Sequence, residues 1–212
     1  MNKIKTIAIA IFLSSLTTLA SAEWRAGVSG AALSLEDVKG SETTSTDTRT
    51  ETLEAMFASV FVEKNLGPVT IGLDVIPYNI ESETNTNDRT GDAVDTGTNS
   101  VQVDIETHAT LYAILGLGDS PAYIKAGMSY ANIATNESMA SGSKYDDADL
   151  EGYHFSLGVQ RELDNSFVRL EIGHSSYDDV SITANGDGNN PNKVTVAGME
   201  GPHARISIGK SF

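Results

Sequence analysis

Residues 101–117 read VQVDIETHATLYAILGL, and this stretch decides the fold of the chain. Its odd positions, from Val101 to Leu117, are almost all apolar, whereas its even positions include Asp104 and Glu106. A β-strand produces such alternation because its successive side chains point to opposite faces. A helix would instead place Asp104 inside an apolar stripe. The stretch therefore predicts one two-faced strand, unusually long for a globular protein and typical of a barrel wall.

Seven other segments alternate in the same way. The predicted strands are 24–35, 53–64, 69–75, 101–117, 122–130, 152–160, 167–173 and 193–212. Three short turns (65–68, 118–121, 163–166) alternate strictly with four long polar segments, 36–50, 81–99, 135–149 and 184–192. Short turns on one side and long loops on the other are typical of outer-membrane barrels. The prediction is an all-β fold, an eight-stranded antiparallel up-and-down transmembrane β-barrel with both termini on the short-turn side.

The first 22 residues have the three parts of a secretory signal peptide. Lys3 and Lys5 precede a short apolar run at 7–13, and Ala20-Ser21-Ala22 gives a small-residue cleavage pattern. Residues 23–212 then form the barrel domain. Loss of the two lysines takes the formal charge from −15 to −17, which excludes binding to nucleic acid through its phosphates. The chain has no cysteine, so the exported domain must be stable without disulfides.

A soluble eight-stranded barrel around a ligand cavity would show the same alternation with its faces reversed. The unequal loop lengths favour the membrane barrel instead. So does the position of aromatic residues near strand ends, where girdles form at membrane interfaces. These residues are Trp24, Tyr78, Tyr130, Tyr153 and Phe212.

The chain ends in ARISIGKSF, residues 204–212, which resembles the C-terminal assembly signal of bacterial outer-membrane barrels, an amphipathic strand ending in Phe. The mature chain resembles the small eight-stranded outer-membrane family of the outer-membrane protein A and X type, sometimes called porin-like. Lys210 departs from that pattern, since it stands on the apolar face, where a lysine near the interface can snorkel. The resemblance implies a place in a Gram-negative outer membrane. It also implies outer-membrane lipid, lipopolysaccharide, periplasmic chaperones and the barrel-assembly machinery as partners, the last through Phe212.

With the apolar face outward, the lumen receives the ionisable side chains. The predicted lumen ion-pair network is Glu54, Asp74, Asp104, Glu106, Lys125, Arg169, Glu171 and Arg205, with His108, His154 and Tyr112 among them. The face of strand 53–64 is ambiguous, and the set containing Glu54 and Met56 is placed inward against the set containing Phe57 and Phe61. An eight-stranded interior is only just filled by side chains, which favours an ion-paired plug. The alternative is a narrow ion-conducting path in which an excess of acidic side chains selects cations.

Two further patterns resemble known catalytic or metal-binding sites. His174 and Ser176 share the outer face and resemble the His-x-Ser pair of a lipid A deacylase barrel, with Glu200 as a third member; the alternative is a solvated strand end. Residues 185–190 resemble a calcium loop but lack its carboxylate spacing and closing Glu. No catalytic, cofactor or metal site is predicted. The favoured function is a non-enzymatic integral outer-membrane protein whose acidic extracellular loops contact divalent cations, lipopolysaccharide or other cells.

Overall fold

The computed structural model describes residues 23–42, 48–89, 96–140, 142–185 and 193–212, and the predicted signal peptide lies outside them. The described residues form 13 strands. Among these residues, no helix is long and apolar enough to cross a bilayer.

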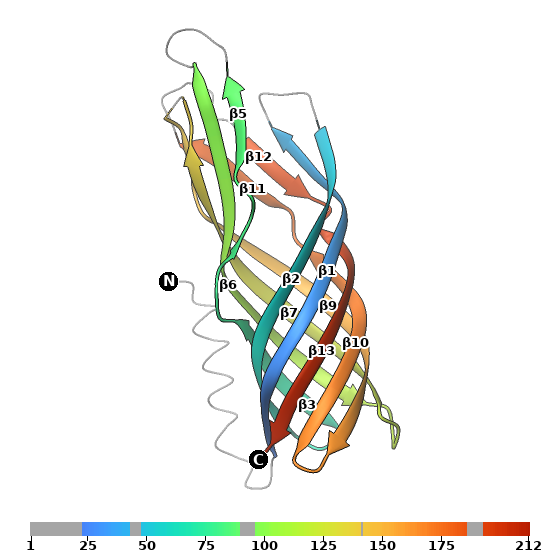
Figure 1. Cartoon of the computed structure of the whole chain (residues 1–212). Helices are drawn as coiled ribbons and strands as arrows, with labels where there is room; N and C mark the ends of the chain where they lie inside the picture. Colours follow the sequence, from blue (N-terminus) through green and yellow to red (C-terminus); the bar gives the residue numbers. More distant parts are fainter. Residues whose placement is uncertain (1–22, 43–47, 90–95, 141, 186–192) are drawn as a thin grey trace.

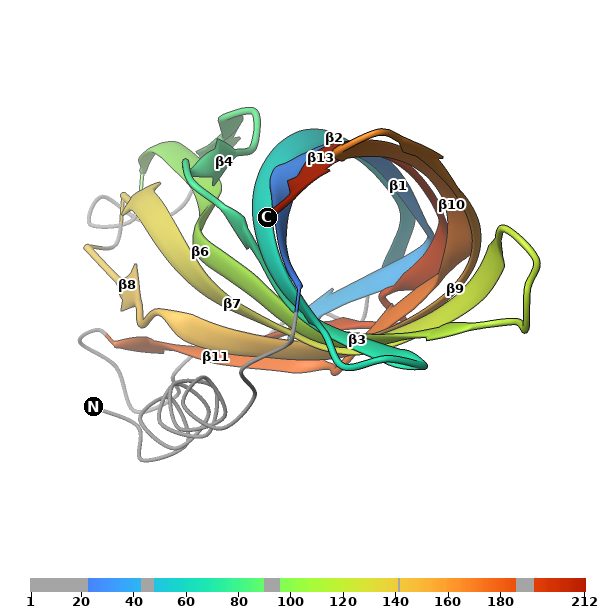
Figure 2. The same ribbon diagram turned by 90° about the horizontal axis from the view of Figure 1, so that it is seen from below.

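Eight of the strands form a closed antiparallel ring in the order β13-β10-β9-β7-β6-β3-β2-β1, with β1 paired back to β13 (Figures 1 and 2). They are β1 (Trp24–Glu42), β2 (Thr48–Asn65), β3 (Val69–Ile76), β6 (Gly97–Gly116), β7 (Ala122–Ser138), β9 (Ala148–Leu163), β10 (Ser166–Tyr177) and β13 (Glu200–Ser211). The predicted eight-stranded barrel is confirmed.

The three short turns lie at the end of the ring that also holds the C-terminus (Figure 1). Gly67, between β2 and β3, has a φ of 91°, which a residue without a side chain adopts at little cost. Asp164 occupies the left-handed region in the two-residue turn between β9 and β10, as Asp and Asn do in tight hairpins. The predicted turn positions are confirmed.

The long polar segments are not loops throughout, and in this respect the sequence-based prediction is wrong. Several ring strands continue beyond the closed part of the barrel. Five further strands pair with them or with each other. These are β4 (Ile80–Glu81), β5 (Asn85–Arg89), β8 (Lys144–Tyr145), β11 (Val180–Asn185) and β12 (Lys193–Ala197). Side-chain polarity does not prevent ladder formation, and threonine, frequent here, favours strands. The predicted strand 193–212 is divided at Gly198, whose φ is 72°.

We call these five strands, together with the ends of the ring strands that pair with them, the extracellular extension, because the sequence-based prediction places the side opposite the short turns outside the cell. It has a hydrophobic core of its own, made by buried side chains from β1, β7, β9, β11 and the segment before β13. The core residues are Val38, Ala131, Leu150, Val180 and Met199. At about 3.3 Å per residue and a tilt near 40°, the 20 residues of β6 span roughly 50 Å along the axis. Because an apolar band is about 25 Å tall, half of this length projects from the membrane.

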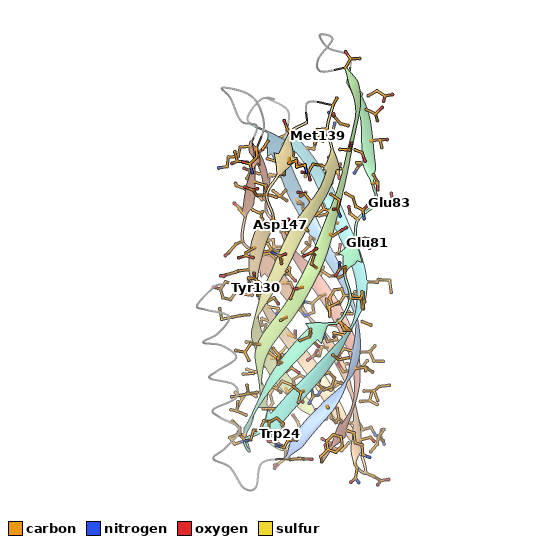
Figure 3. All side chains as sticks on the ribbon, turned by 90° about the vertical axis from the view of Figure 1, so that its left-hand side faces the viewer. Trp24, Glu81, Glu83, Tyr130, Met139 and Asp147 are labelled. Carbon is orange, nitrogen blue, oxygen red and sulfur yellow. The ribbon has the colours of Figure 1, made fainter. Side chains whose placement is uncertain are left out.

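The outer surface of the ring is apolar. Met56 is 86% exposed and Ile172 is 69% exposed, and Val28, Leu157 and Ile208 share this face. Trp24 lies at the lower end of the ring and Tyr130 about halfway up the molecule (Figure 3). Ionisable side chains are instead buried inside the ring. This arrangement inverts that of a water-soluble protein and suits a wall surrounded by acyl chains.

Candidate functional site: the charged lumen

Large aromatic side chains fill the periplasmic part of the lumen, and glycines on the facing strands make room for them. A Cβ at Gly209 would overlap the ring of Phe167, which is fully buried. A Cβ at Gly72 would overlap the ring of Tyr112 in the same way. The lumen is therefore packed with side chains at this level, as expected for a ring of eight strands.

Arg169 and Glu63 form the deepest ion pair. Arg169 Nη2 lies 2.7 Å from Glu63 Oε2, and Nη1 contacts Oε1 of the same carboxylate, so the pair is bidentate. The Tyr112 hydroxyl also donates to Glu63 Oε1, at 2.7 Å. The guanidinium stacks 4.4 Å from the Phe167 ring centroid. A carboxylate that is 0% exposed is thus fully compensated, which a buried charge requires.

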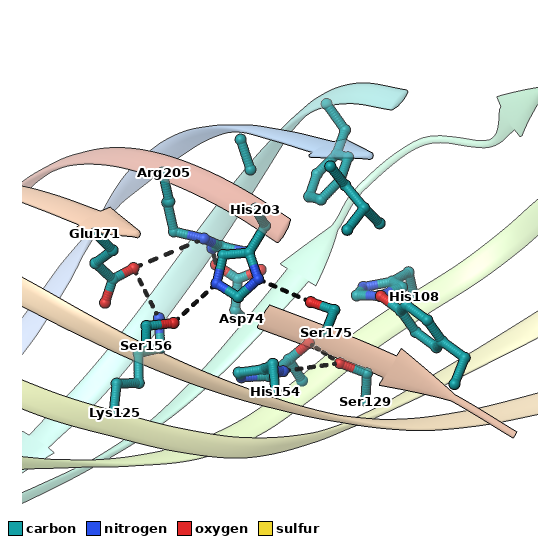
Figure 4. A pocket seen from close by; sticks show the side chains of 15 residues that line it. Asp74, His108, Lys125, Ser129, His154, Ser156, Glu171, Ser175, His203 and Arg205 are labelled. Carbon is teal, nitrogen blue, oxygen red and sulfur yellow. Dashed lines mark hydrogen bonds and ion pairs between the residues drawn. The ribbon is translucent and has the colours of Figure 1, made fainter. Parts of the chain in front are cut away.

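A second group of four charges lies one step further along the strands, since Glu171 follows Arg169 by two residues on β10. Figure 4 shows this group. Lys125 Nζ lies 3.2 Å from Glu171 Oε2, and Arg205 Nη1 lies 2.7 Å from Asp74 Oδ2. Arg205 Nε is also 3.9 Å from Glu171 Oε2, which joins the two pairs. The Tyr123 hydroxyl donates to Glu171 Oε1 at 2.9 Å. All four groups are linked, and their formal charges cancel.

We call these six side chains the charged plug: Glu63, Asp74, Lys125, Arg169, Glu171 and Arg205. Three carboxylates face three bases, so the plug has no net formal charge. Removing one member leaves its partner unpaired in a closed interior, where the penalty is largest.

Above the plug lies a layer of histidine and hydroxyl side chains. His203 bridges two serines, with Nε2 2.8 Å from Ser156 Oγ and Nδ1 2.9 Å from Ser175 Oγ. His154 Nδ1 lies 3.4 Å from Ser129 Oγ (Figure 4). This layer and the upper plug line a cavity of about 30 Å³, large enough for water molecules but for no larger ligand.

The structure brings five of the eight predicted lumen residues together inside the ring, namely Asp74, Lys125, Arg169, Glu171 and Arg205. Asp104 is buried, but it accepts hydrogen bonds from Gln102 and Asn136 and lies in the extracellular extension. Glu106 is the extra residue of a β-bulge between Ile105 and Thr107, where the register shifts, and it is exposed. A bulge is not visible in an alternating pattern, which explains this error.

For Glu54 the predicted face is wrong. It is exposed, as are Met56 and Val60, while Phe61 and Glu63 point inward. Each of the two competing sets of strand 53–64 contains one carboxylate, Glu54 or Glu63, so a carboxylate does not distinguish the faces of this strand. The physical reason is that glycines on facing strands leave room for aromatic rings inside this lumen. A Phe in the sequence therefore does not show which face of the strand meets lipid.

The His174 pattern lies on the outer wall, as the sequence predicted. His174 is exposed, and its Nε2 lies 4.0 Å from Glu200 Oε2 on the neighbouring strand. Ser176 is directly opposite Glu200 in the β10–β13 register. The calcium-like pattern at 185–190 lies mostly outside the described residues. Within the described part of the chain, no group of three His, Asp or Glu side chains is placed to hold a metal ion.

Comparison with known proteins gives one informative likeness. No family model matches the chain, and no curated protein matches it. The structure is similar to the outer membrane protein OprG from Pseudomonas aeruginosa, with a TM-score of 0.54 and 16% identity over 90% of this chain and 95% of that one. The chain has the fold of a small outer-membrane β-barrel. The apolar exterior and the charged interior of the ring fit a wall that is surrounded by acyl chains.

Two other solved barrels are more distant. Neisserial surface protein A has a TM-score of 0.42 and 7% identity over 89% of this chain and 97% of that one. The outer membrane protease OmpT from Escherichia coli has a TM-score of 0.38 and 9% identity over 92% of this chain and 98% of that one.

Proposed function

We propose that this outer-membrane barrel is a non-enzymatic envelope protein with a closed lumen, which acts through its extracellular extension. The charged plug supports the closed lumen, because it crosses the interior between facing strands and is packed by Phe167 and Tyr112. A cation path would need an excess of acid along the lumen, whereas the plug holds equal numbers of acidic and basic groups.

Planar-bilayer recording of the purified, refolded protein tests the closed lumen. We expect no steady unitary conductance from the wild-type protein. The double variant Phe167→Ala, Arg169→Ala removes two large buried side chains that pack against each other in the lumen. It should show conductance, which proves that insertion is detectable. Reproducible cation-selective steps from the wild type would overturn the proposal in favour of the small cation channel.

The surface of the extracellular extension supports a contact role. Its exposed carboxylates come from the ends of ring strands and from the connections between them. They include Glu36, Glu81, Glu83, Asp146, Asp147, Asp149, Asp178 and Asp179. Glu81, Glu83 and Asp147 lie in the upper half of the molecule (Figure 3). A surface with many exposed carboxylates attracts divalent cations, which can bridge it to anionic lipopolysaccharide.

Calcium dependence tests this contact role. Protein in phosphatidylcholine vesicles should bind lipopolysaccharide in the presence of calcium and release it on addition of EDTA. The variant Asp146→Asn, Asp147→Asn, Asp149→Asn should bind less. The variant Asp119→Asn, Glu162→Gln, Asp164→Asn removes the same number of charges at the short-turn end and should bind as the wild type does. Calcium-independent binding would contradict the bridging mechanism.

The outer-wall pair gives a second candidate, a lipid A-modifying hydrolase. The observation that favours it is the position of His174 beside Glu200 and of Ser176 opposite Glu200. In such a reaction Ser176 would attack an acyl ester, with His174 as the base and Glu200 orienting it. Deacylation of lipid A that is lost in Ser176→Ala and retained in Ser175→Ala, whose side chain faces the lumen, would establish this candidate.

A further inference from the structure

The outer wall of the ring carries a groove of about 800 Å³ over β9, β10, β13, β1 and β2, a volume typical of ligand sites. Its shape follows from the strand register. One row across these strands reads Leu157, Ile172, Ala204, Ala32 and Met56. The two alanines in the middle are small and the flanking side chains are large and outward-facing, so the wall is hollowed along β13 and β1.

The groove lies within the membrane, near its outer boundary. Ala204 precedes Phe212 by eight residues, which corresponds to roughly 20 Å above the periplasmic end at a rise of about 3.3 Å and a tilt near 40°. Since the apolar band of such barrels is about 25 Å tall, this row is at the depth of the outer leaflet. Acyl chains are therefore what surrounds the lower part of the groove.

The upper end of the groove is polar and acidic. On the extracellular side of this row, His174 is paired with Phe155 and with Pro202, and Ser34 is paired with Glu54. All five residues line the groove. The Glu200 carboxylate is 4.0 Å from His174 at the same end. Two exposed carboxylates thus stand where a lipid head group would lie, directly above an apolar floor.

We propose that this wall groove binds one acyl chain of an outer-leaflet amphiphile whose head group is positively charged, either through an amine or through a divalent cation bound to its phosphate. The apolar floor fits the chain, and Glu54 and Glu200 repel an anionic head group that lacks such a cation. The site does not depend on the closed lumen or on the contact role of the extracellular extension.

Photolabelling with chain-matched probes tests the site. The wild-type protein in phosphatidylcholine vesicles is photolysed with a diazirine-bearing hexadecylamine, hexadecanol or hexadecyl phosphate, and labelled peptides are mapped by mass spectrometry. We expect the amine to label residues 32–34, 54–56 and 202–204 at least fivefold more than the alcohol. If hexadecyl phosphate labels the groove only when calcium is present, and EDTA abolishes this labelling, then a calcium-bound phosphate is a second source of the same positively charged head group. Equal labelling all round the wall means annular lipid only and overturns the proposal.

Variants separate the contribution of the acyl chain to binding from that of the head group. Ala204→Phe fills the floor and should abolish preferential labelling, whereas Ala113→Phe, an equal change on the outer face of β6, should not. Glu54→Gln with Glu200→Gln should keep the labelled positions but remove the preference for the amine over the alcohol. Ala32→Leu replaces Ala204→Phe if the latter does not give a folded, heat-modifiable band on gels. Unchanged labelling in the filled variant, or unchanged preference in the double Gln variant, contradicts the site.

Discussion

At the scale of residues, the charged plug shows how ionised groups are accommodated in a protein whose outside is apolar. Glu63 receives two contacts from Arg169 and one from the Tyr112 hydroxyl, so its charge is compensated by several donors. Each plug residue depends on its partner, because a closed lumen leaves little water to replace a lost contact.

Replacement of Glu63 by glutamine tests this dependence. Glu63→Gln leaves the Arg169 guanidinium without its counter-ion and should lower the free energy of unfolding by about 3–5 kcal/mol, measured by urea titration in lipid vesicles. Glu162→Gln is the matched control, because Glu162 pairs with Arg25 but is half exposed and should cost about 1 kcal/mol or less. Equal losses in both variants would contradict the importance of burial.

Small residues in the lumen wall are needed for space. Gly209→Ala places a Cβ into the Phe167 ring and should destabilise the barrel by about 1–3 kcal/mol, measured by the same titration. Gly30→Ala should change little, since the nearest atom to its Cβ, Ile206 Cγ2, is 3.8 Å away. The loss caused by Gly209→Ala should shrink in a Phe167→Leu background, and an undiminished loss would argue against this contact.

At the scale of elements, the extracellular extension is an ordered continuation of the barrel wall with its own hydrophobic core. β12 pairs with β1 on one side and with β11 on the other, so the chain between β10 and β13 adds a hairpin to the sheet. Leu150 and Met199 pack together with Val38 beneath this hairpin. The extracellular extension is therefore held in one arrangement by apolar burial.

Weakening this core should expose the extracellular extension to protease while leaving the ring intact. Leu150→Ala removes a buried side chain at an expected cost of about 2–5 kcal/mol, and trypsin should then cleave at Lys144 and Lys193 in vesicles much faster than in the wild type. Leu157→Ala, on the lipid face of the same strand, is the control and should not accelerate cleavage. The observation that would count against this view is equal cleavage rates in all three proteins.

At the scale of the whole molecule, the barrel must reach the outer membrane before any of its surfaces can act. Phe212 is exposed at the periplasmic end, and the Lys210 ammonium lies 5.8 Å from its ring. Neither side chain is buried in the ring, so Phe212 contributes little to the folded barrel. An exposed terminal aromatic of this kind is available to be recognised during assembly.

Deletion of Phe212 should therefore separate assembly from stability. In cells, we expect the deleted form to accumulate in the periplasm as unfolded protein, measured by fractionation and by loss of heat-modifiable migration on gels. In detergent, the same chain should refold to the wild-type extent. Lys210→Ala serves as the control at the same end of β13. Normal assembly of the deletion in cells would remove Phe212 as the assembly signal.

The sequence by itself determined the ring. Alternating hydrophobicity places side chains on two faces of a strand, and the short turns divide the chain, so eight strands and an apolar exterior follow from local patterns. Only the tertiary structure decided which strands carry bulges, which face of β2 points inward and that Glu63 pairs with Arg169, 106 residues away. These depend on cross-strand register and on the space left by glycines opposite aromatic rings. For the same reason the sequence does not predict the wall groove, because Ala32 and Ala204 become neighbours only when β1 pairs with β13.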